Sequence, residues 1–163
     1  MHVMIATAGV LDPESVMRFV ERLVDERGRV SVVTVIEVPR SFLDTLRSEQ
    51  WHPLEERSWI SEEDAGIARY VEERGGRVTE PIMAALRGRG ITAEAHYLEG
   101  EDPAGTIVAA AEQLDADVVI LGATRPLFDE AAWESISARV MRDARRPVLV
   151  IPATPRSEPL EDA

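Results

Sequence analysis

The sequence predicts an α/β domain built on a doubly wound parallel sheet. Two purely aliphatic runs, in segments 117–122 and 146–152, are each bounded by turn residues, as is typical of strands buried on both faces. Strand-like and helix-like segments alternate along the chain, which favours right-handed β-α-β crossovers. The chain has 163 residues and no internal repeat, which suits one domain with a core of its own.

Local patterns assign the first strand, the first helix and the second strand. Residues 2–7 form an apolar run, and Asp12 before Pro13 is a typical N-cap of a helix that Gly28 ends. Residues 30–38 are β-branched almost throughout and predict the second strand. The apolar stripe that this helix should turn towards the core is Val16, Phe19, Val20, Leu23 and Val24.

Segment 40–60 lacks a clean period, so the sequence assigns it no regular element. Its two tryptophans, Trp51 and Trp59, leave three interpretations open. They form a satellite hydrophobic cluster under a long loop, a lid over the crevice of the sheet, or a dimer contact.

The next helix has a clear start and an uncertain middle. A capping-box-like sequence at Ser61 predicts a helix that continues towards Arg74. Gly75, Gly76 and Pro81 are then expected to weaken or kink it, although the apolar residues beyond them keep helical spacing.

The last third supplies the remaining elements. Segment 91–98 alternates apolar and polar residues, as an edge strand does, and Asp102 opens a helix as Asp12 does. A further helix near 133–144 separates the two aliphatic strands. The buried stripe expected for the helix after Asp102 is Ile107, Val108, Ala111 and Leu114. We expect the domain to cover residues 1–152 and residues 153–163 to be a flexible, acidic and proline-rich tail.

Missing residue types exclude several chemistries. The chain has no cysteine, which excludes disulfides, thiolate catalysis and sulfur-ligated zinc. It has no lysine, which excludes Schiff-base chemistry and the lysine of a Walker A loop. His2, His52 and His96 lack metal-ligand spacing, and the sequence contains no nucleophile elbow and no GxGxxG motif. We therefore expect no catalytic residue and no metal site.

The formal net charge of -12 also limits the kinds of partner that the chain is expected to bind. Nucleic-acid binding depends mainly on neutralising phosphates, and anionic membranes attract basic surfaces, so neither partner is expected. No apolar run approaches the ~18 residues that a membrane-spanning helix needs. The first strand begins almost at once, with no basic region or signal-peptide core before it, and the cytoplasm is the expected location.

Five stretches, in order along nearly the whole chain, resemble the universal stress protein family. They are Ile5–Gly9, Val35–Pro39, Gly100–Ala104, Ala116–Gly122, and Ser135–Val140 leading into Arg146–Ile151. The resemblance implies a Rossmann-like domain with a five-stranded parallel sheet in the order 3-2-1-4-5. It also implies a role in stress response and a homodimer paired through the last strand.

The motifs that ATP-binding members of the family share are degenerate here. Those members resemble one another in a Thr-Asp-Gly-Ser-like turn after strand one and a G-x2-G-x9-G-[ST] loop after strand four. The loop brings backbone N–H groups and a helix N-terminus to the phosphates. In the turn, Ala8 stands at the position of the Asp and Val10 at that of the Ser. In the loop, Gly122 matches the first glycine, whereas Arg125 and Glu134 replace the second and the third. Ser135 matches the final Ser or Thr.

The charges of this loop also oppose phosphate binding. A carboxylate about 4 Å from a phosphate oxygen costs about 4 kcal/mol at an effective dielectric constant of about 20. Asp129, Glu130 and Glu134 outnumber Arg125. We expect a crevice at the switch point of the sheet that is less polar than a nucleotide site. Its expected lining is Thr7, Ala8, Gly9, Val38, Gly122, Arg125 and Ser135.

Three hypotheses about function remain. The first is a non-enzymatic binding or regulatory protein in stress response, in which no cofactor is required and a protein partner is an option. The second is a member that binds ATP or another adenine nucleotide, with or without slow ATPase activity, in which Arg125 replaces the missing glycine contacts. The third is an α/β enzyme of another lineage, which would carry a cluster of perturbed pKa values in the crevice.

Two sets of side chains near the last helix have simpler interpretations than ligand binding. Ser135 and Ser137 would cap the helix, although their hydroxyls could also bind an anion there. Arg139, Arg142 and Arg146 would form a solvated face with ion pairs to Asp or Glu.

Overall fold

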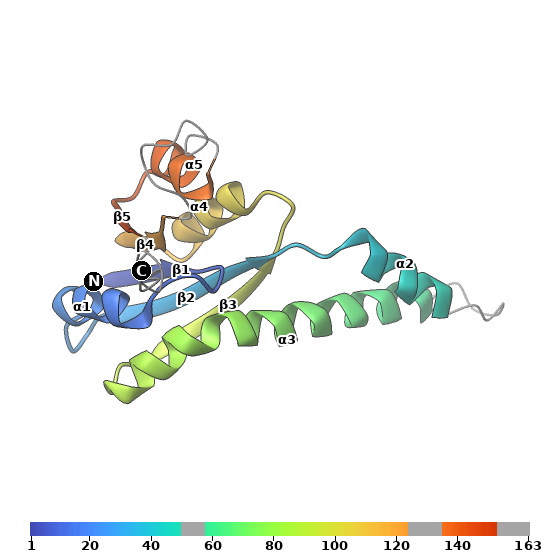
Figure 1. Cartoon of the computed structure of the whole chain (residues 1–163), viewed down its shortest axis with the longest axis horizontal. Coiled ribbons are helices and arrows are strands. Elements are labelled where there is room, and N and C mark those ends of the chain that lie inside the picture. Colours follow the sequence, from blue (N-terminus) through green and yellow to red (C-terminus); the bar gives the residue numbers. More distant parts are fainter. Residues whose placement is uncertain (50–57, 124–134, 153–163) are drawn as a thin grey trace, which may run out of the picture.

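The computed structural model describes residues 1–49, 58–123 and 135–152, and within them five strands form one parallel sheet (Figure 1). The strands are β1 His2–Ala6, β2 Arg29–Ile36, β3 Ala93–Glu99, β4 Val118–Gly122 and β5 Val148–Ile151. Their order is β3-β2-β1-β4-β5, and every neighbouring pair is parallel. The predicted fold class and strand order are confirmed.

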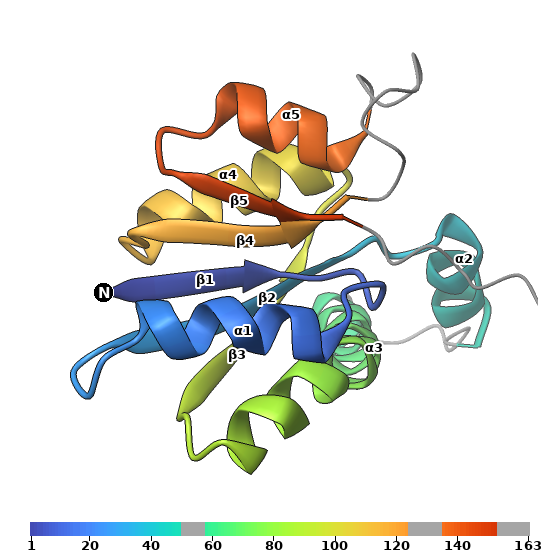
Figure 2. The same ribbon diagram turned by 60° about the vertical axis from the view of Figure 1, so that its left-hand side comes forward.

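Helices cover both faces of the sheet (Figure 2). The described helices are α1 Pro13–Leu23, α2 Arg40–Glu49, α3 Ser58–Gly88, α4 Pro103–Gln113 and α5 Ile136–Asp143, and all but α2 contribute to these faces. Apolar residues of α1 and α3 pack on one face of the sheet, and those of α4 and α5 pack on the other. The arrangement is the doubly wound one in which a parallel sheet is shielded from water on both sides.

The central strand β1 is buried along its whole length. It pairs with β2 on one side and with β4 on the other. Val3 and Ile5 point into the core beneath α1 and α3, whereas Met4 and Ala6 point into the core beneath α4 and α5. This alternation explains why a strand at the centre of such a sheet reads as a continuous apolar run.

The prediction that both C-terminal aliphatic runs are buried on both faces is wrong for the second. In β5 only Ile151 is buried, and the other three residues are partly exposed. The reason is position in the sheet: among the described strands β5 pairs with β4 alone, so no described strand covers its outer edge.

Helix α1 begins as predicted and ends earlier. The Asp12 carboxylate accepts the Ser15 N–H at 2.9 Å, which satisfies one of the unpaired donors of the first turn. The helix ends at Leu23 rather than at Gly28, which instead lies in the turn that leads into β2. The predicted stripe is also wrong at Phe19, which is 38% exposed, because Met17 takes the buried place at 1%.

A helix that the sequence did not predict, α2, occupies residues 40–49. It packs against α3, and the rings of Phe42 and Tyr70 lie 4.6 Å apart between their centroids. The contact with α3 supplies the stability that the local sequence of α2 does not, because an amphipathic helix takes most of its stability from packing. The interpretations of Trp51 and Trp59 fall outside the residues whose side chains the structure describes.

Helix α3 runs without a break through the residues that were expected to weaken or kink it. It begins at Ser58, before the predicted start, and continues through Gly75, Gly76 and Pro81. Figure 1 shows it crossing the sheet beneath β3 and extending well beyond it beside α2. Tertiary packing overrides the low helix propensity of these residues, because Ile82 is almost wholly buried in the core.

At Gly75, helix α3 lies close against strand β3. A Cβ atom at this position would lie 2.4 Å from Cγ of Tyr97 on β3, closer than side chains tolerate. At the adjacent Gly76 the nearest atom would be the Tyr97 hydroxyl, at 3.8 Å, which is an ordinary contact. The two glycines therefore differ: the first is required by packing and the second is not.

We expect Gly75→Ala to destabilise the fold by about 1–3 kcal/mol, because the ring of Tyr97 and the helix must move apart. Gly76→Ala is the matched control and should stabilise it by about 0.5–1 kcal/mol, since alanine is the better helix former. Urea unfolding followed by circular dichroism measures both. Equal effects of the two substitutions would contradict the close approach at Gly75.

Candidate functional site

A cavity of about 100 Å³ lies at the carboxyl ends of β1 and β4. This is the switch point of the sheet, where the strand order reverses and where open α/β sheets bind ligands. The residues that line it come from β1, β2, β4, α4, α5 and the turn after β1. They are Ala6, Thr7, Ala8, Val10, Leu11, Val33, Val35, Pro103, Ile107, Leu121, Gly122, Ile136 and Ser137.

The lining is mostly apolar, and its two hydroxyl groups are already engaged. Thr7 Oγ1 accepts the Gly9 N–H at 3.0 Å, and Ser137 Oγ lies 3.1 Å from Ser135 Oγ. Thr7 and Ser137 are both buried, at 7% and 2% exposure. Among the described residues that line the cavity there is no charged side chain.

The structure brings together some of the predicted site residues. Thr7, Ala8 and Gly122 line the cavity. Gly9 follows them in the turn with a positive φ of 86°, a conformation that glycine adopts without strain. Val38 is not among the lining residues, because β2 ends at Ile36.

Two further predicted site residues also lie apart from the lining. Ser135 is not part of it, although Ile136 and Ser137 beside it are. Arg125 lies outside the residues that the structure describes.

Sequence reasoning missed the wall that α4 contributes. Pro103 and Ile107 lie four residues apart on α4 and so share one face of it. The sequence pattern assigns Ile107 to the core stripe of this helix. The same stripe reaches the cavity at the amino end of α4. The signal was therefore present in the sequence, but helical spacing alone does not tell a core position from a cavity wall.

Ser135 is the cap of α5, as the simpler interpretation had it. Its hydroxyl accepts the Ala138 N–H at 3.2 Å, which occupies one of the free donors of the first turn. The same hydroxyl lies beside that of Ser137, so the two serines form one small polar group at the start of the helix.

A two-point ion pair joins α4 to α5 beside the cavity. Arg139 donates from Nη1 and Nη2 to the two oxygens of Asp102, at 2.7 and 3.1 Å. Asp102 is the N-cap residue of α4, but its side chain makes no capping hydrogen bond. The hydrogen bond from the Arg139 guanidinium holds the pKa of this carboxyl below its ordinary value.

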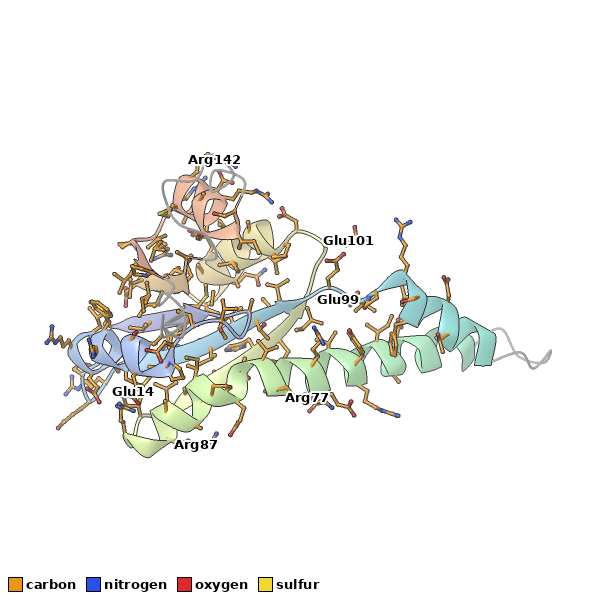
Figure 3. The ribbon with its side chains drawn as sticks, in the orientation of Figure 1. Glu14, Arg77, Arg87, Glu99, Glu101 and Arg142 are labelled. Atoms are coloured by element: carbon orange, nitrogen blue, oxygen red, sulfur yellow. The ribbon has the colours of Figure 1, made fainter. Side chains whose placement is uncertain are left out.

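The other arginines of this surface are paired as predicted. Arg142 donates to Asp143, and Arg146 pairs with Asp115 and with Glu112. In Figure 3, Arg142 lies at the outer end of α5, away from the sheet. Arg142 is exposed and Arg146 is half-buried, and both already hold carboxylates, so the charge they present to a phosphate is largely offset.

Within the described parts of the chain, no group of three or more His, Asp or Glu residues is arranged to hold a metal ion. His2 and His96 lie on the separate strands β1 and β3, and His52 falls outside the described residues. None of the described helices is both long and apolar enough to cross a membrane.

The chain matches the family model of the universal stress proteins over residues 1–152. Among solved structures, hypothetical protein MJ0577 is 18% identical with a TM-score of 0.63, over 94% of this chain and 96% of that one. A universal stress protein family protein from Arabidopsis thaliana with AMP bound is 14% identical with a TM-score of 0.58, over 99% and 97%. A universal stress protein in complex with cAMP is 16% identical with a TM-score of 0.56, over 94% and 98%. Curated protein sequences give no significant match.

The ion pair between α4 and α5 can be tested by titration. We expect NMR to show the Asp102 pKa below its ordinary value and Arg139→Gln to raise it towards that value. Since the folded-state pKa is the lower one, the pair stabilises the fold at higher pH and its contribution is lost as the pH falls through that pKa. Arg87→Gln, which breaks an exposed pair with Glu80 on α3, is the control and should leave Asp102 unchanged. A normal Asp102 pKa in the unmodified protein would refute the pairing.

Proposed function

Since the chain belongs to the universal stress protein family, we propose that it is a non-enzymatic binding and regulatory protein of the stress response. Its cavity at the ends of β1 and β4 takes a small apolar ligand, or the apolar part of one, in place of ATP. The observation that carries this proposal is the lining, in which Ala8 and Val10 stand where ATP-binding members have polar groups. We place this activity in the cytoplasm.

The size of the cavity supports a small ligand. Pockets for drug-sized molecules enclose about 300–1,000 Å³. The cavity here is about 100 Å³. An apolar cavity of about 150 Å³ holds benzene, so benzene is about the largest apolar group that this smaller cavity could take up. A whole nucleotide would have to extend out of the cavity, over a surface that offers its phosphates little positive charge.

The electrostatics support the same conclusion. Arg139 is the arginine closest in sequence to the described lining, and its guanidinium already binds both oxygens of Asp102. A phosphate that displaced Asp102 would leave that carboxylate beside it without its partner. The energetic gain from the arginine would thus be offset by repulsion between two anions.

Binding of an adenine nucleotide is the second candidate, and one observation favours it. Two universal stress proteins with the same fold have been solved with AMP bound and in complex with cAMP. In this chain the start of α5, with Ser135 and Ser137, lies at the end of the sheet that holds the cavity. In this alternative Arg125 would supply the contacts that the absent glycines provide elsewhere.

Thermal unfolding of nucleotide-stripped protein separates the two candidates. We expect no rise in Tm with ATP, ADP or AMP, with or without Mg²⁺, up to millimolar concentrations. A ligand that binds only the folded state at 100 times its Kd would stabilise it by about 2.7 kcal/mol. A rise of several degrees that Arg125→Ala abolishes would refute the proposal and establish the alternative.

Benzene is the probe for the apolar cavity. We expect it to raise Tm and to shift the methyl NMR signals of Val33 and Ile107, which line the cavity. Val35→Phe should fill part of the cavity and remove the effect. Val108→Phe is the control, because Val108 packs against the same core without lining the cavity. If benzene has no effect, or the same effect in both variants, the cavity is not a ligand site.

We also propose a homodimer that forms through the open edge of β5. The Val119 N–H donates to Pro147 O, and the Ala123 N–H donates to Ile151 O. Because peptide groups alternate in direction along a strand, the N–H groups of Val148 and Val150 point to the open edge. They are free to pair with a second copy of the same strand.

Proline substitution on β5 tests this dimer. We expect sedimentation analysis to find a dimer for the unmodified chain and a folded monomer for Val150→Pro, which loses an outward N–H only. Leu149→Pro is the contrast, because it removes an N–H that faces β4 and should destabilise the fold itself. A dimer that survives Val150→Pro would place the contact elsewhere.

A further inference from the structure

A second cavity, of about 310 Å³, lies at the opposite end of the sheet, where β1, β2 and β3 begin. We propose that it binds a small zwitterion, such as a free amino acid, through separate groups for the carboxylate and the ammonium. The residues that line it are His2, Gly28, Arg29, Val30, Ser31, Thr92, Ala93, Glu94, Gln113 and Leu114. It shares no residue with the cavity at the carboxyl ends of the strands.

The strand register groups these side chains into two rows. His2 is the partner of Arg29, and Ser31 is the partner of Glu94 two residues further along β2. Residues two apart on a strand point to the same face, so Arg29 and Ser31 face the cavity from one side of the sheet. The first row, His2 and Arg29, therefore carries the guanidinium cation. The second row, Ser31 and Glu94, carries a hydroxyl and a carboxylate.

A buried chain of hydrogen bonds makes Ser31, in the second row, a hydrogen-bond acceptor towards the cavity. His2 is 6% exposed, and its Nδ1 lies 2.9 Å from Leu114 O, which can only accept. Nδ1 must therefore carry a proton, and in this tautomer Nε2 accepts from Ser31 Oγ at 2.9 Å. The Ser31 hydroxyl hydrogen is thereby used, so Ser31 presents lone pairs to the cavity. Together with the Glu94 carboxylate it forms an acceptor site for an ammonium group.

The first row is the complementary donor site. Among the described residues, no side chain forms an ion pair or hydrogen bond with the Arg29 guanidinium. Thr92 precedes the paired residues of β3 and adds a hydroxyl to the same cavity. A planar guanidinium with five donors is well suited to a carboxylate.

The two charged groups of the cavity do not neutralise each other. Among the described residues no ion pair joins Arg29 to Glu94, and the Glu94 carboxylate lies 3.8 Å from His96 Nε2. The backbones of the two rows are about 6.6 Å apart along the strand, so the long side chains of Arg29 and Glu94 can both reach one small molecule that carries both charges. A simple anion would meet Glu94 and a simple amine would meet Arg29, so both should bind more weakly than the zwitterion.

The test uses the full chain and three probes: L-alanine, propionate and ethylamine. We expect L-alanine to shift the backbone amide NMR signals of Ser31 and Glu94 in a saturable way at millimolar concentration, because the charged groups are exposed. Propionate and ethylamine, which each carry one of its two charges, should bind at least about tenfold more weakly. Arg29→Ala and Glu94→Ala should each weaken L-alanine binding by a similar factor.

Arg77→Ala is the matched control, because Arg77 is an exposed arginine of α3 that does not line this cavity (Figure 3). It should leave L-alanine binding unchanged. Three results would overturn the proposal: no saturable shift with L-alanine, equal affinity for propionate, or full binding by either cavity variant. The amide spectra also show whether each variant is folded, so lost binding is distinguished from lost structure.

Discussion

The structure depends on one constraint, which is that a parallel sheet must be covered on both faces. The central strand β1 satisfies it fully, since each of its residues is buried between two layers of helices. Where the helices stop, the sheet ends are left open. The cavity at the carboxyl ends and the cavity at the amino ends are these two openings. Their positions therefore follow from the layering, whereas their chemistry follows from the side chains at each end.

The two ends of the sheet differ in polarity. At the carboxyl end the lining is mostly aliphatic, and Ala8 and Val10 contribute to it from the turn after β1. At the amino end, the β2 run is preceded by Arg29 and broken by Ser31, and the carboxylate of Glu94 lies in register with that hydroxyl. Ion pairs such as that of Asp102 with Arg139 hold neighbouring helices together near the first site. The charges of these side chains already neutralise one another when no ligand is bound.

The sequence predicted the sheet well because buried strands carry their own signal, an aliphatic run between turn residues. It predicted α2 and α3 poorly, since their stability comes from contacts between residues distant along the chain. The ring of Phe42 lies against that of Tyr70, and Gly75 fits against Tyr97. The site was predicted in part: residues beside the strand ends could be named, but the wall from α4 could not. A helical stripe does not reveal where the core ends and a cavity begins.

The register of β1 has a consequence for how the chain is made. Val3 pairs with Val30 on β2 and with Val118 on β4, so the two partners of one central strand lie far apart along the chain. As the chain leaves the ribosome, β1 can pair with β2 early but must wait for most of the remaining residues before β4 appears. During that interval the second edge of an apolar strand is exposed to other chains. Chaperone contact during synthesis would protect this edge until the sheet closes around it.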